Sequence, residues 1–129
     1  MNSKPRFEEI AQILDQLIEE IPEIYLRGLN GGIILSEEIL YHPQGKNQDL
    51  LIMGQYQVSP LGRMIVLYYG SIYARHRFTP HQALVEALRD LLHHELTHHL
   101  ERLAGENDLA LEDMRQIEDY QASRKEENE

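Results

Sequence analysis

Residues 79–105 read TPHQALVEALRDLLHHELTHHLERLAG, and they form the longest stretch of the chain with one uninterrupted helical pattern. Leucine and alanine recur in it at three- and four-residue steps, which gives a helix a wide apolar face. Thr79 is expected to cap this helix, with Pro80 at its first position, and Gly105 is well placed to end it. The stretch predicts a long helix with one side packed against the rest of the chain.

The chain before this helix carries one more helical pattern and then patterns typical of strands. Residues 6–20 repeat apolar side chains every three or four positions, and Pro22 is expected to end or kink that helix. Apolar, partly alternating stretches at 33–41 and 50–58 are compatible with strands. Residues 64–69, MIVLYY, are the clearest strand because they are rich in β-branched and aromatic side chains.

The remaining segments are short or polar. Gly70 is expected to close the last strand, and a short helical piece is expected at 71–75. A further helix is expected at 110–121, followed by a charged and frayed tail over 123–129. Together these patterns predict one domain of the α+β class spanning residues 1–129.

The composition excludes several classes of protein. Acidic residues outnumber lysine and arginine by 22 to 12, and the formal net charge is −10. A chain this acidic is a poor ligand for nucleic acid or for an anionic membrane, because both bind clustered basic residues. The absence of cysteine excludes a disulfide framework, a thiol nucleophile and a cysteine-ligated zinc finger. No apolar signal core and no apolar run of membrane-spanning length is visible, so a cytoplasmic protein is expected.

The middle of the long helix contains the pentapeptide His94-Glu95-Leu96-Thr97-His98, which matches the pattern H-E-x-x-H. His94 and His98 stand one helical turn apart on one face, so their imidazoles can reach the same cation. Zinc accepts imidazole nitrogens, and Glu95 beside the pair can hydrogen-bond a zinc-bound water and take its proton. The motif predicts a zinc site with His94 and His98 as ligands and Glu95 as the catalytic residue.

The helical wheel also predicts which way this site points. The two ligand histidines fall on nearly the same side as Ala87 and Leu91, which indicates the covered side of the helix. His93 falls on the far side and is expected to be solvated. His99 leans toward the leucine stripe, so it is expected to pack or to support a ligand rather than to bind metal.

A third protein ligand must come from beyond the two histidines. Glu101 lies on the same helix face one turn further on, where it could accept a hydrogen bond from a ligand ring. Asp108, Glu112 and Asp113 follow the turn at Gly105. Chain geometry favours Asp108, with Glu112 next, whereas an exposed acidic cap is the structural alternative for Asp108.

Features on both sides of the motif carry a family resemblance. The stretch 94–99, HELTHH, is followed by 105–108, GEND, and preceded by the strand-like run 63–70, RMIVLYYG. On these residues the whole chain resembles the small bacterial zincin-like metallopeptidases, the minimal zincins. Members of that family typically carry H-E-x-x-H-x-x-G-x-x-D. In this chain the G-x-x-D part is kept, and four extra residues separate it from the second histidine of the pattern.

The resemblance implies an α+β fold with an amino-terminal helix, a small mixed β-sheet, a long metal-bearing helix and a short carboxy-terminal helix. It implies Zn²⁺ as cofactor, Asp108 as the third ligand, and a peptide or protein as substrate. In such enzymes a strand at the sheet edge pairs with extended substrate, a role that fits a strand between residues 50 and 69. Tyr68, Tyr69 and Tyr73 are candidates for stabilising the oxyanion.

The leading expectation is a zinc metallopeptidase that hydrolyses peptide bonds with an activated water and a glutamate base. One alternative is a zinc-binding regulatory or interaction module without proteolysis. Another is a hydrolase that uses the same activated water on a different amide or an ester. A metal-free structural domain is the remaining alternative.

Overall fold

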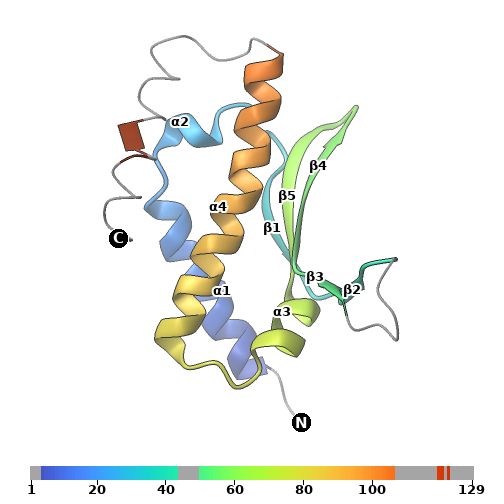
Figure 1. Cartoon of the computed structure of the whole chain (residues 1–129), viewed down its shortest axis with the longest axis vertical. Helices are drawn as coiled ribbons and strands as arrows, with labels where there is room; N and C mark the ends of the chain where they lie inside the picture. The colour runs from blue at the N-terminus through green and yellow to red at the C-terminus, as the bar shows by residue number, and fades with distance from the viewer. Residues whose placement is uncertain (1–3, 44–49, 107–118, 121, 123–129) are drawn as a thin grey trace.

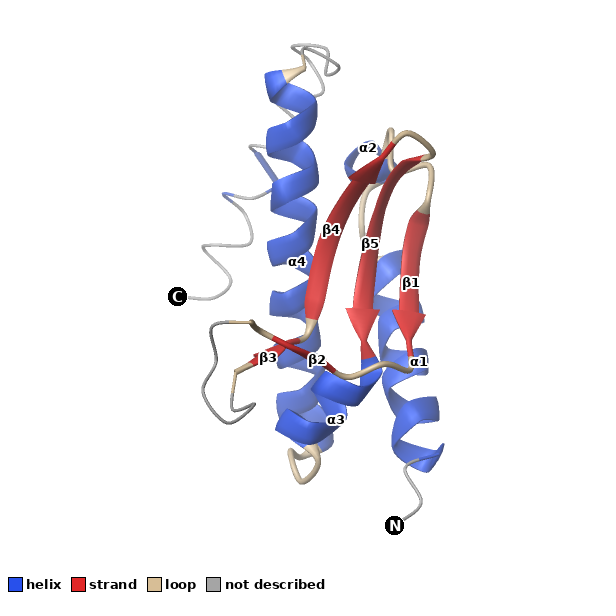
Figure 2. Cartoon of the chain, turned by 90° about the vertical axis from the view of Figure 1, so that its right-hand side faces the viewer, coloured by secondary structure: helices blue, strands red, loops and turns tan. Residues whose placement is uncertain are grey.

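A computed structural model describes residues 4–43, 50–106, 119–120 and 122 of the chain. The described part is a small sheet with two helices, α1 and α4, side by side on one of its faces (Figures 1 and 2). The elements follow the order α1 (Lys4–Glu19), α2 (Glu23–Leu26), β1 (Gly32–Ser36), β2 (Leu40–Tyr41), β3 (Leu51–Ile52), β4 (Gly54–Ser59), β5 (Gly62–Tyr68), α3 (Tyr69–His76) and α4 (His81–Gly105).

The main sheet is mixed. Its strand order is β1-β5-β4, with β1 parallel and β4 antiparallel to the central strand β5. β2 and β3 form a separate antiparallel pair. The α+β class and the small mixed sheet are therefore confirmed, and β4 is an edge strand within the described part of the chain.

Both of the longer predicted strands are broken in two. The stretch 33–41 separates into β1 and β2 because the chain turns between them. At the turn, the Glu38 carbonyl accepts the N–H of Gly70 at 2.9 Å, and the N–H of Leu40 donates to Ser71 Oγ at 2.8 Å. The stretch 50–58 separates into β3 and β4 at Met53, whose carbonyl accepts the N–H of Tyr68 at 2.9 Å. These are contacts between distant segments, which local patterns do not report.

The core lies between the helices and the sheet. Leucine and isoleucine side chains from one stripe of α1 and one stripe of α4 pack against the buried face of β5. The burial of these side chains is the main stabilising term, at about 25 cal/mol per Å² of apolar surface. The members that are least exposed, each at 1% or less, are Ile10, Ile65, Leu67, Ile72, Leu84, Leu88 and Leu92.

Two predicted boundaries are wrong. Gly70 does not close β5 but lies in α3, where a Cβ would come within 2.8 Å of the Glu38 carbonyl, so the glycine allows the turn before β2 to lie against the helix. Thr79 does not cap α4. The helix begins at His81, with Pro80 in the capping position, and the Thr79 hydroxyl instead hydrogen-bonds His76 Nδ1 at 3.1 Å.

The end of α4 is where the sequence predicts it. Gly105 is the last helical residue, and the following N–H, that of Glu106, donates to the Arg102 carbonyl at 3.1 Å. The helix expected at 110–121 and the tail at 123–129 lie almost wholly outside the described residues. Among those that are described, Tyr120 packs its ring against Tyr25 at a centroid distance of 5.2 Å. No helix in the described ranges is long and apolar enough to cross a bilayer.

Candidate functional site

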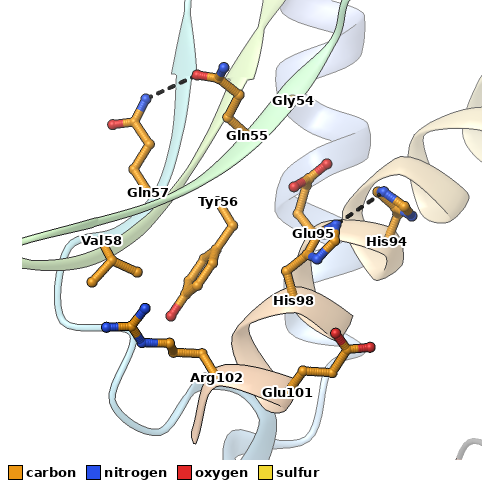
Figure 3. A pocket seen from close by; sticks show the side chains of 10 residues that line it. All are labelled: Gly54, Gln55, Tyr56, Gln57, Val58, His94, Glu95, His98, Glu101 and Arg102. Carbon is orange, nitrogen blue, oxygen red and sulfur yellow. Dashed lines mark hydrogen bonds between the residues drawn. The ribbon is translucent and has the colours of Figure 1, made fainter. Parts of the chain in front are cut away.

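The middle of α4 places the two motif histidines together at the surface. His94 Nε2 and His98 Nε2 lie 3.3 Å apart, and the ring centroids are 4.8 Å apart with the rings nearly perpendicular. Figure 3 shows both rings on the same side of the helix, next to each other. The helix therefore brings together the two imidazoles that the four-residue spacing predicts.

This separation fits a shared zinc ion. Zinc–imidazole bonds of about 2.0–2.1 Å at a tetrahedral angle put the two nitrogens roughly 3.3–3.4 Å apart. The distance between the two nitrogens, which share a hydrogen bond in the structure, is therefore compatible with one shared ion. Within residues 4–43, 50–106, 119–120 and 122, no third histidine, aspartate or glutamate joins them in a cluster of three. Glu101 is thus not a third ligand in this arrangement, and Asp108, Glu112 and Asp113 lie outside the described residues.

The predicted direction of the site is wrong in one respect. His94 and His98 are exposed, whereas Glu95 between them is only 6% exposed. The covered side of α4 is occupied by leucines, and β4 lies against the helix at Glu95. The histidines therefore stand at the rim of the sheet–helix contact rather than beneath it.

Glu95 is held at that contact. Burial raises the pKa of its carboxyl, while the charges of His94 and His98 and a hydrogen bond from the main chain of Tyr56 act in the opposite direction. Gly54 makes the close approach possible, because a Cβ there would lie 2.9 Å from Leu67 Cδ2 and 3.4 Å from Glu95 Cγ. The carboxyl is thus buried, hydrogen-bonded to β4 and adjacent to both motif histidines.

His99 links α4 to the same strand. Its side chain is fully buried, with Nε2 2.8 Å from the Arg27 carbonyl and Nδ1 2.8 Å from the Tyr56 hydroxyl. Because a carbonyl can only accept, Nε2 carries the ring proton and Nδ1 accepts from the Tyr56 hydroxyl. Burial lowers the pKa of His99, which disfavours the charged ring. The expectation that His99 leans into the leucine stripe and packs there is confirmed by its burial.

The environment of His93 differs from the expectation of a solvated residue. It is half-buried, and its carbonyl accepts the Thr97 hydroxyl at 2.9 Å. Of the four histidines in this segment, only His94 and His98 have exposed rings directed at each other.

An open cleft of about 860 Å³ runs between β4 and α4 beside the two histidines (Figure 3). From β4 it is lined by Gly54, Gln55, Tyr56, Gln57 and Val58, and from α4 by His94, Glu95, His98, Glu101 and Arg102.

Sequence reasoning missed the tyrosine of this cleft. Tyr68, Tyr69 and Tyr73 do not line it: the Tyr68 hydroxyl donates to Gln55 Oε1 at 2.7 Å, and Tyr69 packs edge-on against Phe7. Tyr56 lines the cleft instead, and burial raises its pKa. The alternating pattern of residues 54–58 contained the only signal, since it puts Tyr56 on one face of a strand.

Comparison with solved structures gives a relationship that covers most of the chain. A conserved hypothetical protein from T. thermophilus is 32% identical and superposes with a TM-score of 0.65, over 78% of this chain and 98% of the other. This chain belongs to the family of that protein. No family model matches the sequence, and no curated protein is significantly similar to it. The relationship supports the α+β fold, and the neighbour's description names no activity.

Proposed function

We propose that the protein is a zinc-dependent metallopeptidase of the zincin type. His94 and His98 would bind the ion, with Asp108 as the third protein ligand. The observation that carries the proposal is the 3.3 Å separation of the two Nε2 atoms, which equals the separation that tetrahedral zinc requires. Asp108 is proposed on the G-x-x-D part of the sequence pattern alone.

The residues around the two histidines suit hydrolysis. When bound, zinc would polarise the carbonyl of the substrate and lower the pKa of its bound water from about 15.7 toward 7. Glu95 would take the proton of that water on its carboxylate and pass it to the leaving amine. Its burial at the cleft beside both histidines supports this role, because a general base must be held within hydrogen-bond reach of the water.

The edge strand supports a peptide as substrate. In an antiparallel pair, alternate residues direct their main-chain N–H and C=O groups toward the partner strand or away from it. The main-chain N–H of Tyr56 points toward Glu95 and therefore away from β5. The main-chain groups of Val58, two residues further along β4, also point away from β5. An extended peptide in the cleft can form main-chain hydrogen bonds there, as in other strand-addition complexes.

A zinc-binding interaction module without proteolysis is the second candidate. The open, exposed histidine pair would serve such a module equally well. The buried Glu95, whose carboxyl abuts the cleft beside both histidines, favours the hydrolase. A hydrolase of another amide or ester would use the same groups, and substrate screening separates it from a peptidase.

The proposal is tested with Glu95→Gln. Zinc-loaded wild type is expected to cleave members of a broad fluorogenic peptide library. The variant is expected to keep stoichiometric zinc and to lose cleavage by about 10²–10⁴-fold, the usual contribution of a general base. Glu86→Gln is the matched control, because Glu86 lies on the same helix and pairs with Arg89 outside the cleft.

Undiminished cleavage by Glu95→Gln would contradict the role of Glu95. Stoichiometric zinc without turnover of any library member would favour the interaction module.

A further inference from the structure

One end of the cleft is formed by a positively charged side chain. Beyond His98, α4 continues for almost two more turns, and Arg102 stands on the same helix face as His94 and His98 because the three residues are four apart. Arg102 is the lone arginine or lysine among the described residues that line the cleft. It also lines a second hollow of about 370 Å³ next to the β4–β5 turn, so it stands where the two hollows meet.

The guanidinium is held in place from one side. Its Nε donates to Glu106 Oε1, and the other oxygen of Glu106 accepts Arg63 Nη2. Two guanidinium groups therefore share one carboxylate. In the part of the chain that the structure describes, no hydrogen bond occupies the Nη atoms of Arg102, and its side chain is half-exposed. The Nη atoms of the Arg102 guanidinium thus remain available as donors to a ligand, while its Nε is held by Glu106.

At this end of the cleft Arg63 and Arg102 share the carboxylate of Glu106, in a chain whose net charge is −10. Burial and the charge of Glu106 raise the pKa of Tyr56 on the cleft wall, and the charges of Arg63 and Arg102 act in the opposite direction. Glu101 is the other charged residue at this end, and Figure 3 shows its carboxylate directed away from the Arg102 guanidinium. A planar carboxylate is the group that a guanidinium fork binds best.

The position of Arg102 sets where a ligand carboxylate would lie. Arg102 lies four positions after His98 on the helix, which corresponds to a rise of about 6 Å. An extended peptide advances about 3.3 Å per residue, so the carboxylate would lie roughly two residues from the bond that faces the histidines.

We propose that Arg102 forms a carboxylate-binding subsite of the cleft, which takes either an acidic side chain or the free carboxyl terminus of a peptide about two residues from the scissile bond. The subsite rests on the proposed peptidase function for its substrate, but it can be measured through binding alone.

The test measures binding of fluorescent peptides to zinc-loaded Glu95→Gln protein, which should not turn them over. Three peptides of equal length are compared: a neutral one with an amidated end, the same with one internal aspartate, and a neutral one with a free carboxyl terminus. At least one carboxylate peptide is expected to bind about tenfold more tightly than the neutral amide, as charged hydrogen bonds require. The peptide that gains identifies the source of the carboxylate.

Variants then assign the preference to Arg102. In the Glu95→Gln protein, the further substitution Arg102→Met is expected to abolish the preference for carboxylate peptides, and Arg102→Lys is expected to keep part of it. Arg102→Glu is expected to shift the preference toward a lysine-containing peptide. Arg89→Met is the control, since Arg89 lies on α4 outside the cleft and pairs with Glu86 and Glu20.

Equal binding of the three peptides, no measurable binding of any, or a preference that survives Arg102→Met would overturn the subsite. Cleavage by wild type is measured separately. If wild type cleaves nothing while the Arg102-dependent preference is present, the peptidase proposal fails and the subsite stands. If wild type cleaves peptides while the Arg102-dependent binding preference is absent, the peptidase stands and the subsite fails.

Discussion

Two regions of α4 combine histidine with glutamate, and they use the combination in opposite ways. At the start of the helix, His81 Nδ1 lies 2.6 Å from Glu9 on α1, and Arg6 pairs with the same glutamate at 2.7 Å. In the middle of the helix, His94 and His98 face each other and not Glu95, which is buried against β4.

The difference separates a structural contact from a candidate ligand site. In the first region Glu9 pairs with both Arg6 and His81, and Arg6 also donates to the carbonyls of His76 and Thr79, so the cluster ties α1 to the start of α4. In the second region two imidazoles are exposed beside a cleft with nitrogen atoms at the spacing of a shared ion. The presence of histidine and glutamate alone thus does not separate a candidate ligand site from a structural contact. The mutual geometry of the side chains separates them.

The largest expected effect concerns zinc affinity. His94→Ala and His98→Ala each remove a direct ligand and are expected to weaken zinc binding by more than about a hundredfold, the upper end for residues that only support a ligand. His81→Ala is expected to leave zinc affinity unchanged. Isothermal titration with a competing chelator measures all three. Equal losses in the three variants would erase the distinction between the regions.

The next effect concerns how closely β4 lies on α4. Gly54→Val would place carbon atoms against Leu67, Leu91 and Glu95, and it is expected to reduce the free energy of unfolding by about 3 kcal/mol. Gly105→Ala is the control, because nothing lies within 4 Å of a Cβ at that helical position. It is expected to be neutral or stabilising by up to about 1 kcal/mol. Urea denaturation monitored by circular dichroism compares them, and a neutral Gly54→Val would disprove the close contact.

A smaller effect concerns the buried link between Tyr56 and His99. Tyr56→Phe leaves Nδ1 of a fully buried imidazole without its donor, which is expected to cost about 1–2 kcal/mol of unfolding free energy. Tyr41→Phe, in the separate pair of short strands, is expected to cost less than about 0.5 kcal/mol. Denaturation curves decide between them, and equal costs would mean that the hydrogen bond contributes nothing.

The smallest effect is a pH dependence in the first region. The pKa of Glu9 is lowered, first by its hydrogen bond with His81 and then by that with Arg6. A carboxyl whose pKa is lower in the folded chain stabilises the fold above its ordinary value, 4.5, and loses that contribution as the pH falls through the folded pKa. Glu9→Gln is expected to cost about 1 kcal/mol at pH 7 and progressively less as the pH falls below 4.5.

Unfolding free energies at a series of pH values test this, with Glu8→Gln as the exposed neighbour that should show no such trend. A cost of Glu9→Gln that is constant from pH 3 to pH 7 would contradict the pairing.

Much of this geometry follows from local sequence, and the rest depends on distant contacts. The helix with His94 and His98 one turn apart could be predicted because a four-residue step fixes their neighbourhood within one element. The burial of His99 followed from the leucine stripe for the same reason. These expectations needed no knowledge of the sheet.

Other features depended on which strand meets α4. Tyr56 enters the cleft because β4 lies at the edge of the sheet and Gly54 lets it approach Glu95, neither of which alternation along residues 50–58 reveals. Gly70 looked like the end of a strand, but the close approach of the Glu38 carbonyl explains it better. In the sequence nothing separates Arg102 from other charged residues of the helix, and only the cleft shows what it borders.

The most direct measurement of the central claim is zinc K-edge X-ray absorption on protein loaded with one equivalent of zinc. A four-coordinate ion is expected, with two imidazole nitrogens at about 2.0–2.1 Å and oxygen in the remaining positions. The same spectrum is expected from His81→Ala, and one fewer imidazole from His98→Ala. A spectrum without imidazole ligands, or one that His98→Ala leaves unchanged, would contradict the metal site and the function built on it.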